Sequence, residues 1–479
     1  MRRISTGVPG LDVVLGGGLE PGSVVVLAGA PGTGKTIMAQ QICFAAATAE
    51  HRAIYYTTVS EPNSKLMRHL EQFSFFDASA LEKRVEYLHV GDLIRRAGAE
   101  TLGPVFDEVV RKALAEEPAV MVVDSAKALR DFTDLREMRE ALYDLTSRLG
   151  HTDSILLLVG EYTPEDVQGG AEFSQADCII HVEYEPREPV DRRWLRVVKM
   201  RGTRHREGKH TFRVGGDGIE VFPRIENLDA GRPAEVTGRI HSGLPRLDEL
   251  MGGGIGSGEA TIVVGPSGVG KTIFGLRFAL EGLRRGDRCL YVTFQDTPEQ
   301  LVKMAAGFGW DLRTALDEGQ LRVLHVPLGD LDLDMLASGI RGDLARGPVN
   351  RVVIDSLAEM ADAARERARF PAFTRSLIGF IRAAGASLVI TSETTTLGPT
   401  GEPAGGVMFL FHNLLLLRYI ELASGSGRAL NVVKMRNSGH DKYVHQFDIG
   451  PDGMMIGDRL DGVAGMLGWS ALTASGRPA

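Results

Sequence analysis

A glycine-rich phosphate-loop motif occurs twice in this chain and constrains its fold more than any other feature. The first copy begins at Gly29 and the second at Gly265, and each fits the pattern Gly-x-x-x-x-Gly-Lys-Thr. In such a loop the glycines let backbone N–H groups surround a phosphate, the lysine reaches the β- and γ-phosphates, and the hydroxyl joins Mg²⁺. The predicted nucleotide-binding residues are Gly29, Ala30, Pro31, Gly32, Thr33, Gly34, Lys35, Thr36, Gly265, Pro266, Ser267, Gly268, Val269, Gly270, Lys271 and Thr272.

The sequence around both motifs predicts a strand, the loop and then a helix. Short apolar runs precede the loops, Val24 to Leu27 and Ala260 to Val264, and helix-like stretches follow them, Ile37 to Ala47 and Ile273 to Arg284. This order delivers the positive end of a helix dipole to the phosphates. Both motifs are therefore predicted to bind a nucleotide, with ATP and Mg²⁺ as the expected cofactors.

The similarity between the two halves extends well beyond the loops. Residues 4–36 align with 240–272 without a gap. Later segments also correspond: 120–125 with 351–356, and 197–201 with 432–436. A repeat this long indicates duplicated globular domains. We predict a first domain over 1–230, a second over 231–461 with the same internal order of elements, and a flexible tail over 462–479.

Each half is predicted to be an α/β domain, a mostly parallel sheet flanked by helices. Asp124 and Asp355 end apolar strands, which places a carboxylate at the carboxyl edge of the sheet. At that edge the carboxylate lies near the metal that the loop hydroxyl also contacts. The predicted metal ligands are Thr36 with Asp124, and Thr272 with Asp355.

Hydrolysis of ATP also needs a group that orients or deprotonates water. One subset of phosphate-loop proteins carries a carboxylate after the strand that follows the first helix. Here that position gives Glu61 in the first half and Asp296 in the second. The alternative role for both residues is to cap the next helix, where acidic side chains are common.

Composition excludes several other classes of protein. The apolar fraction of 43% is ordinary for a globular protein, and every sustained apolar run is far shorter than the roughly 20 residues of a membrane helix. Three scattered cysteines predict no disulfide framework and no zinc site, and the first residues lack a signal-peptide core, so we expect a cytoplasmic protein. A net charge of −8 argues against nucleic acid as a partner, since such binding depends on clustered Lys and Arg. The basic stretch 201–210 is either a polyanion contact, a solvated hairpin or a subunit contact.

The ordered motifs resemble the KaiC family, the circadian-clock ATPases and their bacterial and archaeal relatives within the RecA-type group. The likeness rests on Gly-x-x-x-Leu-Asp before a Gly-Gly-Gly turn, the phosphate loop, the Asp-Ser strand end and Lys-Met-Arg-Gly-Thr-Arg-His. It implies two tandem RecA-like domains and a homo-hexamer with two rings. It also implies that a late Lys-x-Arg motif reaches the neighbouring subunit's ATP, which assigns catalytic roles to Lys199, Arg201, Lys434 and Arg436. A cation there would neutralise charge on the γ-phosphate, and the alternative is a charged surface strand.

The sequence departs from the family pattern in two places. The family carries paired glutamates after the strand, and here the first of the pair is Ser60 or Gln295. The two autophosphorylated hydroxyl residues of the family correspond to Met408 and Phe409, which cannot accept phosphate. The threonines of the loop over 394–400 either accept phosphate in place of these two residues or simply form a turn.

These observations favour an ATP-binding, slowly hydrolysing ATPase that acts as an oligomeric signalling protein with unknown protein partners. Three alternatives stay open: a serine/threonine autokinase, a DNA-handling motor, and a nucleotide-gated scaffold with little turnover. Fold alone does not decide among them.

Overall fold

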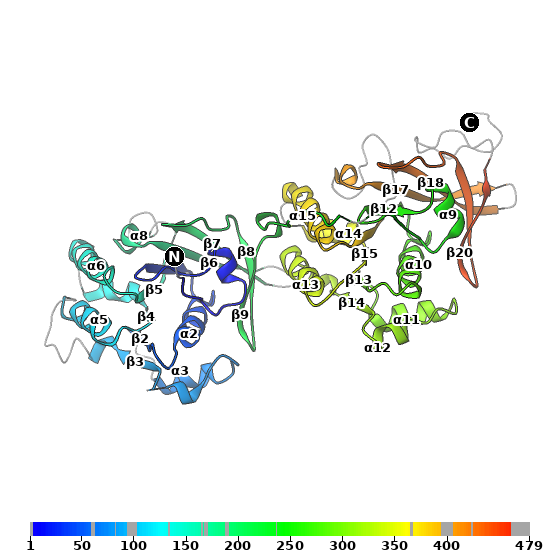
Figure 1. The fold of residues 1–479 in the computed structure, drawn as a ribbon. Helices are drawn as coiled ribbons and strands as arrows, with labels where there is room; N and C mark the ends of the chain where they lie inside the picture. The colour runs from blue at the N-terminus through cyan, green and yellow to red at the C-terminus, as the bar shows by residue number, and fades with distance from the viewer. Residues whose placement is uncertain are drawn as a thin grey trace. The chain divides into compact units, whose positions relative to one another are not determined.

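The structure is a computed structural model that describes residues 3–58, 63–81, 83–92, 103–132, 135–163, 166, 171–186, 191–235, 237–364, 367–393, 406–422 and 425–460. The chain divides into two compact units, Met1–Asn227 and Leu228–Ala479. The sequence predicts the domain boundary after residue 230. Each unit is described by itself below (Figure 1).

The first unit is built on one sheet. Its strands are β1 (Val24–Gly29), β2 (Ala53–Thr57), β3 (Val85–His89), β4 (Val120–Asp124), β5 (Ile155–Glu161), β6 (Cys178–Glu185), β7 (Arg192–Met200), β8 (His210–Gly215) and β9 (Gly218–Phe222). Their spatial order is β3-β2-β4-β5-β1-β6-β7-β8-β9. Pairing is parallel from β3 to β6 and antiparallel from β6 to β9. The predicted mostly parallel α/β architecture is confirmed.

The second unit repeats this sheet strand for strand. Its strands are β12 (Ala260–Gly265), β13 (Cys289–Thr293), β14 (Leu321–His325), β15 (Arg351–Asp355), β16 (Ser387–Glu393), β17 (Asn413–Leu422), β18 (Gly425–Met435), β19 (Val444–Gly450) and β20 (Gly453–Arg459). The order β14-β13-β15-β16-β12-β17-β18-β19-β20 matches that of the first unit. A short pair, β10 (Arg239–Ile240) and β11 (Ile255–Gly256), precedes the sheet. The gap-free repeat in the sequence thus corresponds to a repeated topology.

Helices cover both faces of the first sheet, so its central strands are apolar throughout. The helices are α1 (Leu11–Val14), α2 (Lys35–Ala46), α3 (Asn63–Leu70), α5 (Gly103–Glu116), α6 (Leu135–Leu149) and α8 (Ala171–Gln175). Val25 and Leu27 pack in one core with residues of α1 and α2, whereas Val24 and Val26 pack in another with residues of α5 and α6. Alternate residues of β1 therefore face opposite cores, which is why a central parallel strand reads as a continuous apolar run.

The second sheet is covered in the same way. Its helices are α9 (Pro245–Leu250), α10 (Lys271–Arg284), α11 (Pro298–Ala306), α12 (Arg313–Asp317), α13 (Leu333–Ala345), α14 (Leu357–Ala363) and α15 (Phe370–Ala383). Val263 packs in a core with residues of α9, α10, α11 and α12, whereas α14 and α15 contact β16. In both units the strand before the phosphate loop, β1 or β12, is the fifth of the nine strands, so the loop lies at the centre of the carboxyl edge of the sheet.

A search of the described helices for one that is both long and apolar enough to span a membrane finds none.

Candidate functional site

Both phosphate loops lie between a central strand and a helix, as the sequence predicts. β1 ends at Gly29 and α2 begins at Lys35, and β12 and α10 enclose the second loop in the same way. The residue before each helix is a glycine with positive φ, 100° at Gly34 and 115° at Gly270, a conformation that other residues adopt only at a cost. This turn aims the free N–H groups of the helix start into the loop.

The loop lysines fold back onto their own loops. Lys35 Nζ donates to the carbonyl of Ala30 at 2.7 Å, and Lys271 Nζ donates to that of Pro266 at 2.9 Å. Burial lowers the pKa of both ammonium groups, against the opposing effect of nearby carboxylates. A phosphate placed in the loop would give each lysine a charged partner, so both loops fit the phosphate groups of a nucleotide.

Each loop hydroxyl is hydrogen-bonded to the aspartate that ends the acidic strand. Thr36 Oγ1 donates to Asp124 Oδ2 at 2.9 Å, and Thr272 Oγ1 donates to Asp355 Oδ2 at 2.7 Å. Hydroxyl and carboxylate oxygens are the ligand types that Mg²⁺ prefers. The four residues predicted to hold the metal are thus brought together in two pairs, and they fit the ion.

The strand between the loop strand and the acidic strand also ends in a carboxylate. Glu161 ends β5 opposite Gly29 of β1, and Glu393 ends β16 opposite Gly265 of β12. Neither residue is among the site residues predicted from the sequence, although a glutamate at the end of an apolar run in each half is a signal that could have identified them.

A buried tyrosine supports each strand-end aspartate. Tyr55 Oη donates to Asp124 Oδ2 at 2.7 Å, and Tyr291 Oη donates to Asp355 Oδ2 at 3.3 Å. Burial raises the pKa of Asp124, and the bonds from Tyr55 and Thr36 oppose that shift. These tyrosines were also missed, since their role depends on the pairing of β2 with β4 and of β13 with β15.

The cavity at the first loop measures about 980 Å³ and that at the second about 250 Å³. The charged residues described around the first are Lys35, Lys127, Arg130, Arg193, Asp124 and Glu161. Those described around the second are Lys271, Asp296, Asp355, Glu359 and Glu393. The two halves therefore share a loop geometry but differ in charge.

The structure describes one of the two carboxylates that are predicted to activate water. Glu61 lies outside the described residues. Asp296 lines the second cavity, and burial together with the nearby Asp355 carboxylate raises its pKa. Its predicted catalytic role stays a prediction.

The late cations lie away from the cavity of their own half. Lys199 Nζ donates to the carbonyl oxygens of Phe173 and Ser174 at 3.3 Å, and Arg201 pairs with Asp177 at 3.3 Å. Among the described residues, neither Lys199 nor Arg201 lines the first cavity.

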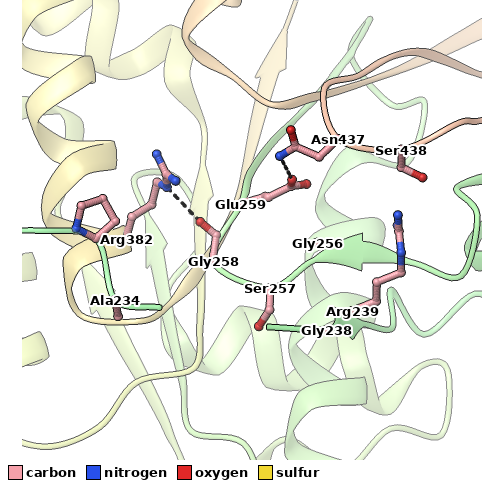
Figure 2. Close-up of a pocket in the computed structure, with 11 residues that line it drawn as sticks. Ala234, Gly238, Arg239, Gly256, Ser257, Gly258, Glu259, Arg382, Asn437 and Ser438 are labelled. Carbon is pink, nitrogen blue, oxygen red and sulfur yellow. Dashed lines mark hydrogen bonds between the residues drawn. The ribbon is translucent and has the colours of Figure 1, made fainter. Parts of the chain in front are cut away.

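The second half holds its late cations in the same way. Lys434 Nζ donates to the carbonyl of Phe411 at 2.7 Å, and Arg436 donates to that of Phe409 at 3.1 Å. Figure 2 shows the polar hollow beside this motif, where Asn437 donates to Glu259 at 2.7 Å. Glu259 is buried and also accepts from Asn413, so it fixes the turn that follows the cations.

The positions that correspond to the phosphorylated residues of the KaiC family lie in a short 3₁₀ segment, Met408–Leu410. Phe409 is 54% exposed, yet neither side chain offers a hydroxyl. The threonines at 394–400 lie outside the described residues.

Comparison with known proteins places both halves in one family. The family model described as "ATPase: KaiC" matches twice, over residues 4–226 and 240–461. A circadian clock protein KaiC3 from Synechocystis sp. is 27% identical over 98% of this chain and 94% of its own length. A circadian clock oscillator protein KaiC from Picosynechococcus sp. is 28% identical over 96% of this chain and 90% of its own. The chain, with its two phosphate loops on two repeated sheets, belongs to the KaiC ATPase family.

Proposed function

We propose that both halves of the chain bind Mg-ATP and that the protein hydrolyses ATP slowly. The observation that carries this proposal is the repeated contact between the loop hydroxyl and the strand-end aspartate, at 2.9 Å in the first half and 2.7 Å in the second. Phosphate loops use this pair to hold the metal beside the β- and γ-phosphates.

In this scheme the chain's own groups bind and orient the nucleotide. The loop N–H groups and Lys35 or Lys271 hold the phosphates, and the hydroxyl–aspartate pair takes the metal, which when bound neutralises charge on the transferred phosphoryl group. Glu61 and Asp296 are the carboxylates predicted to orient water. Slow turnover is consistent with Ser60 and Gln295, which stand where the family carries its first glutamate.

We propose further that the protein works as a double-ringed homo-hexamer. The support is that Lys199, Arg201, Lys434 and Arg436 lie outside the cavities of their own halves, as cations delivered to a neighbour would. Nucleotide state in the ring would then be read by protein partners, as an oligomeric signalling protein requires. The relatives are named circadian clock proteins, which makes a signalling role the closest precedent.

Autokinase activity is the second candidate, and the side chains at 408 and 409 disfavour it. Phosphoryl transfer to protein needs an acceptor hydroxyl, and Met408 and Phe409 have none.

The test combines nucleotide stoichiometry, phosphate release and intact mass after incubation with ATP. We expect two nucleotides per wild-type chain, one for Lys35→Ala and one for Lys271→Ala, with phosphate release and no gain in mass. One nucleotide per wild-type chain, unchanged in Lys271→Ala, would refute binding by the second half. A stoichiometric mass gain of one phosphate would favour the kinase.

A further inference from the structure

The second cavity contains a carboxylate that belongs to none of the motifs above. Glu359 lies in the first turn of α14, which begins directly after Asp355 and Ser356. Gln295 Nε2 donates to Glu359 Oε1 at 2.5 Å, and Ser356 Oγ donates to Glu359 Oε2. Glu359 and Gln295 both line the cavity with Lys271. A carboxylate held by two donors thus faces the loop that is proposed to hold the γ-phosphate.

Helix capping does not account for this arrangement. Ser356 is the residue before α14 and Glu359 is the third residue of that helix, the spacing of a capping box. In a capping box the serine oxygen accepts from the backbone N–H, whereas here no side-chain cap bond forms and the serine hydroxyl donates to the glutamate. Helix α11 differs, because there Thr297 and Gln300 form both hydrogen bonds of a capping box.

The first half lacks this group. In the alignment that pairs Asp124 with Asp355, the residue matching Glu359 is Ala128. Its neighbour Lys127 lines the first cavity and pairs with Asp166 at 2.8 Å. At this aligned position the carboxylate therefore occurs in the second half and not in the first, and it is in the second half that Gln295 replaces the first acid of the family's pair after the strand.

We infer that Glu359 is the general base of the second half, held for that task by Gln295, an inference that rests on the proposed hydrolysis of ATP. The water oxygen forms a bond to the γ-phosphorus while the bond from that phosphorus to the β–γ bridging oxygen breaks. The water proton passes to the Glu359 carboxylate, and ADP and inorganic phosphate leave. General-base catalysis of this kind contributes about 10²- to 10⁴-fold.

The test measures phosphate release by the full chain beside the number and affinity of bound nucleotides, with a non-hydrolysable ATP analogue for the affinity. The fall in phosphate release from wild type to Lys271→Ala measures the share of hydrolysis that the second half supplies. Glu359→Gln keeps the size of the side chain and an acceptor oxygen, so we expect it to lose that whole share. It should still bind two nucleotides per chain, with an affinity at the second site no lower than that of the wild type, because the change removes a negative charge from the cavity. Glu299→Gln, an exposed carboxylate in the first turn of α11, is the matched control and should leave release unchanged.

Two further variants separate the roles in this cavity. Asp296→Asn should reduce the second-half share less than Glu359→Gln does. Gln295→Leu should lower kcat for the hydrolysis by the second half and leave KM unchanged, because it removes a donor to the Glu359 carboxylate and leaves the phosphate loop and Lys271 intact.

The outcomes separate this inference from the proposed function. If Lys271→Ala releases phosphate at the wild-type rate, the second half does not hydrolyse ATP, and the proposal and the inference both fail there. If Lys271→Ala loses a share that Glu359→Gln keeps, only the inference fails. Loss of the second nucleotide in Glu359→Gln would likewise overturn it, because the residue would then serve binding.

Discussion

At the scale of single residues, each candidate nucleotide site contains a half-buried aspartate that accepts hydrogen bonds from a tyrosine and from the loop threonine. Asp124 accepts from Tyr55 and Thr36, and burial nonetheless raises its pKa above the ordinary value of 3.8. A bound metal ion would stabilise the ionised form of this carboxylate, since its positive charge offsets the negative charge that burial disfavours.

This pKa shift predicts that ionised Asp124 lowers the free energy of unfolding of the metal-free protein in a pH-dependent way. A raised folded-state pKa means that the fold binds the Asp124 proton more tightly than the unfolded chain does, so stability is lost as pH rises above 3.8 and up to the raised value. We expect Asp124→Asn to raise the free energy of unfolding at pH 7 without metal, and this gain to vanish below about pH 3.8. Urea unfolding at several pH values in chelator measures it. A variant less stable than wild type at pH 7 would contradict the assigned cost.

The residue scale also shows what the sequence could predict. Both loops and the pairs Thr36–Asp124 and Thr272–Asp355 were predictable because each motif is local or repeats. Glu359 was not, because its approach to Gln295 depends on β13 and β15 being neighbours, which spacing alone does not reveal.

At the scale of elements, short helices after the strands place the groups around the second cavity. α11 starts at Pro298, and its N-cap residue Thr297 directly follows Asp296. Thr297 Oγ1 accepts from the Gln300 backbone N–H, and Gln300 Oε1 accepts from the Thr297 backbone N–H. This capping box fixes where the chain leaves β13, and with it Gln295 and Asp296.

Loss of the cap should therefore destabilise the second half. Thr297→Ala removes the acceptor for a helix N–H, and such changes cost about 1 kcal/mol. Thr297→Ser keeps the hydroxyl and should cost much less. Equilibrium unfolding followed by circular dichroism compares the two, and equal stability of Thr297→Ala and wild type would show that the cap contributes nothing.

Some secondary-structure elements and their pairing could be predicted from the sequence, and others could not. Strand, loop and helix around each phosphate loop follow from local apolar runs and glycines. The antiparallel extension β6-β7-β8-β9, and its copy β17-β18-β19-β20, depends on which strand edges pair. This extension carries Lys199, and its copy carries Lys434, at the ends of β7 and β18.

At the scale of the whole molecule, the placement of the late cations predicts that catalysis needs assembly. Removal of a true arginine finger costs about 10³-fold or more in rate, whereas a solvated surface arginine costs almost nothing. We expect Arg201→Ala and Lys35→Ala subunits, both with Lys271→Ala, to be nearly inactive alone.

Mixing these two variants should restore part of the activity. Mixed rings contain some interfaces with an intact loop and an intact arginine. Phosphate release after mixing measures the recovery, with hexamer formation as the control. No recovery in properly formed hexamers would rule out a trans role for Arg201.

The unequal charge of the two cavities predicts unequal dependence on metal. Lys127 and Arg130 pair with Asp166, which leaves Lys35 and Arg193 to face Asp124 and Glu161 in the first cavity. Among the described residues that line the second cavity, Lys271 is the one cation beside Asp296, Asp355, Glu359 and Glu393. We expect chelation of Mg²⁺ to weaken nucleotide binding at the second site at least 10-fold more than at the first. Titration of Lys35→Ala and Lys271→Ala with nucleotide, with and without chelator, separates the sites, and equal losses would contradict the prediction.

With a nucleotide bound in each half, as proposed, the unequal charge of the two cavities would give the two nucleotides different conditions for exchange. ATP without Mg²⁺ carries its full negative charge into either cavity, and among the described lining residues the first cavity has more cations than the second. A fall in available Mg²⁺ would then lower occupancy more in the second half than in the first. One polypeptide that uses a single fold twice would thus carry one site that stays occupied longer and one that responds more strongly to the concentration of Mg²⁺.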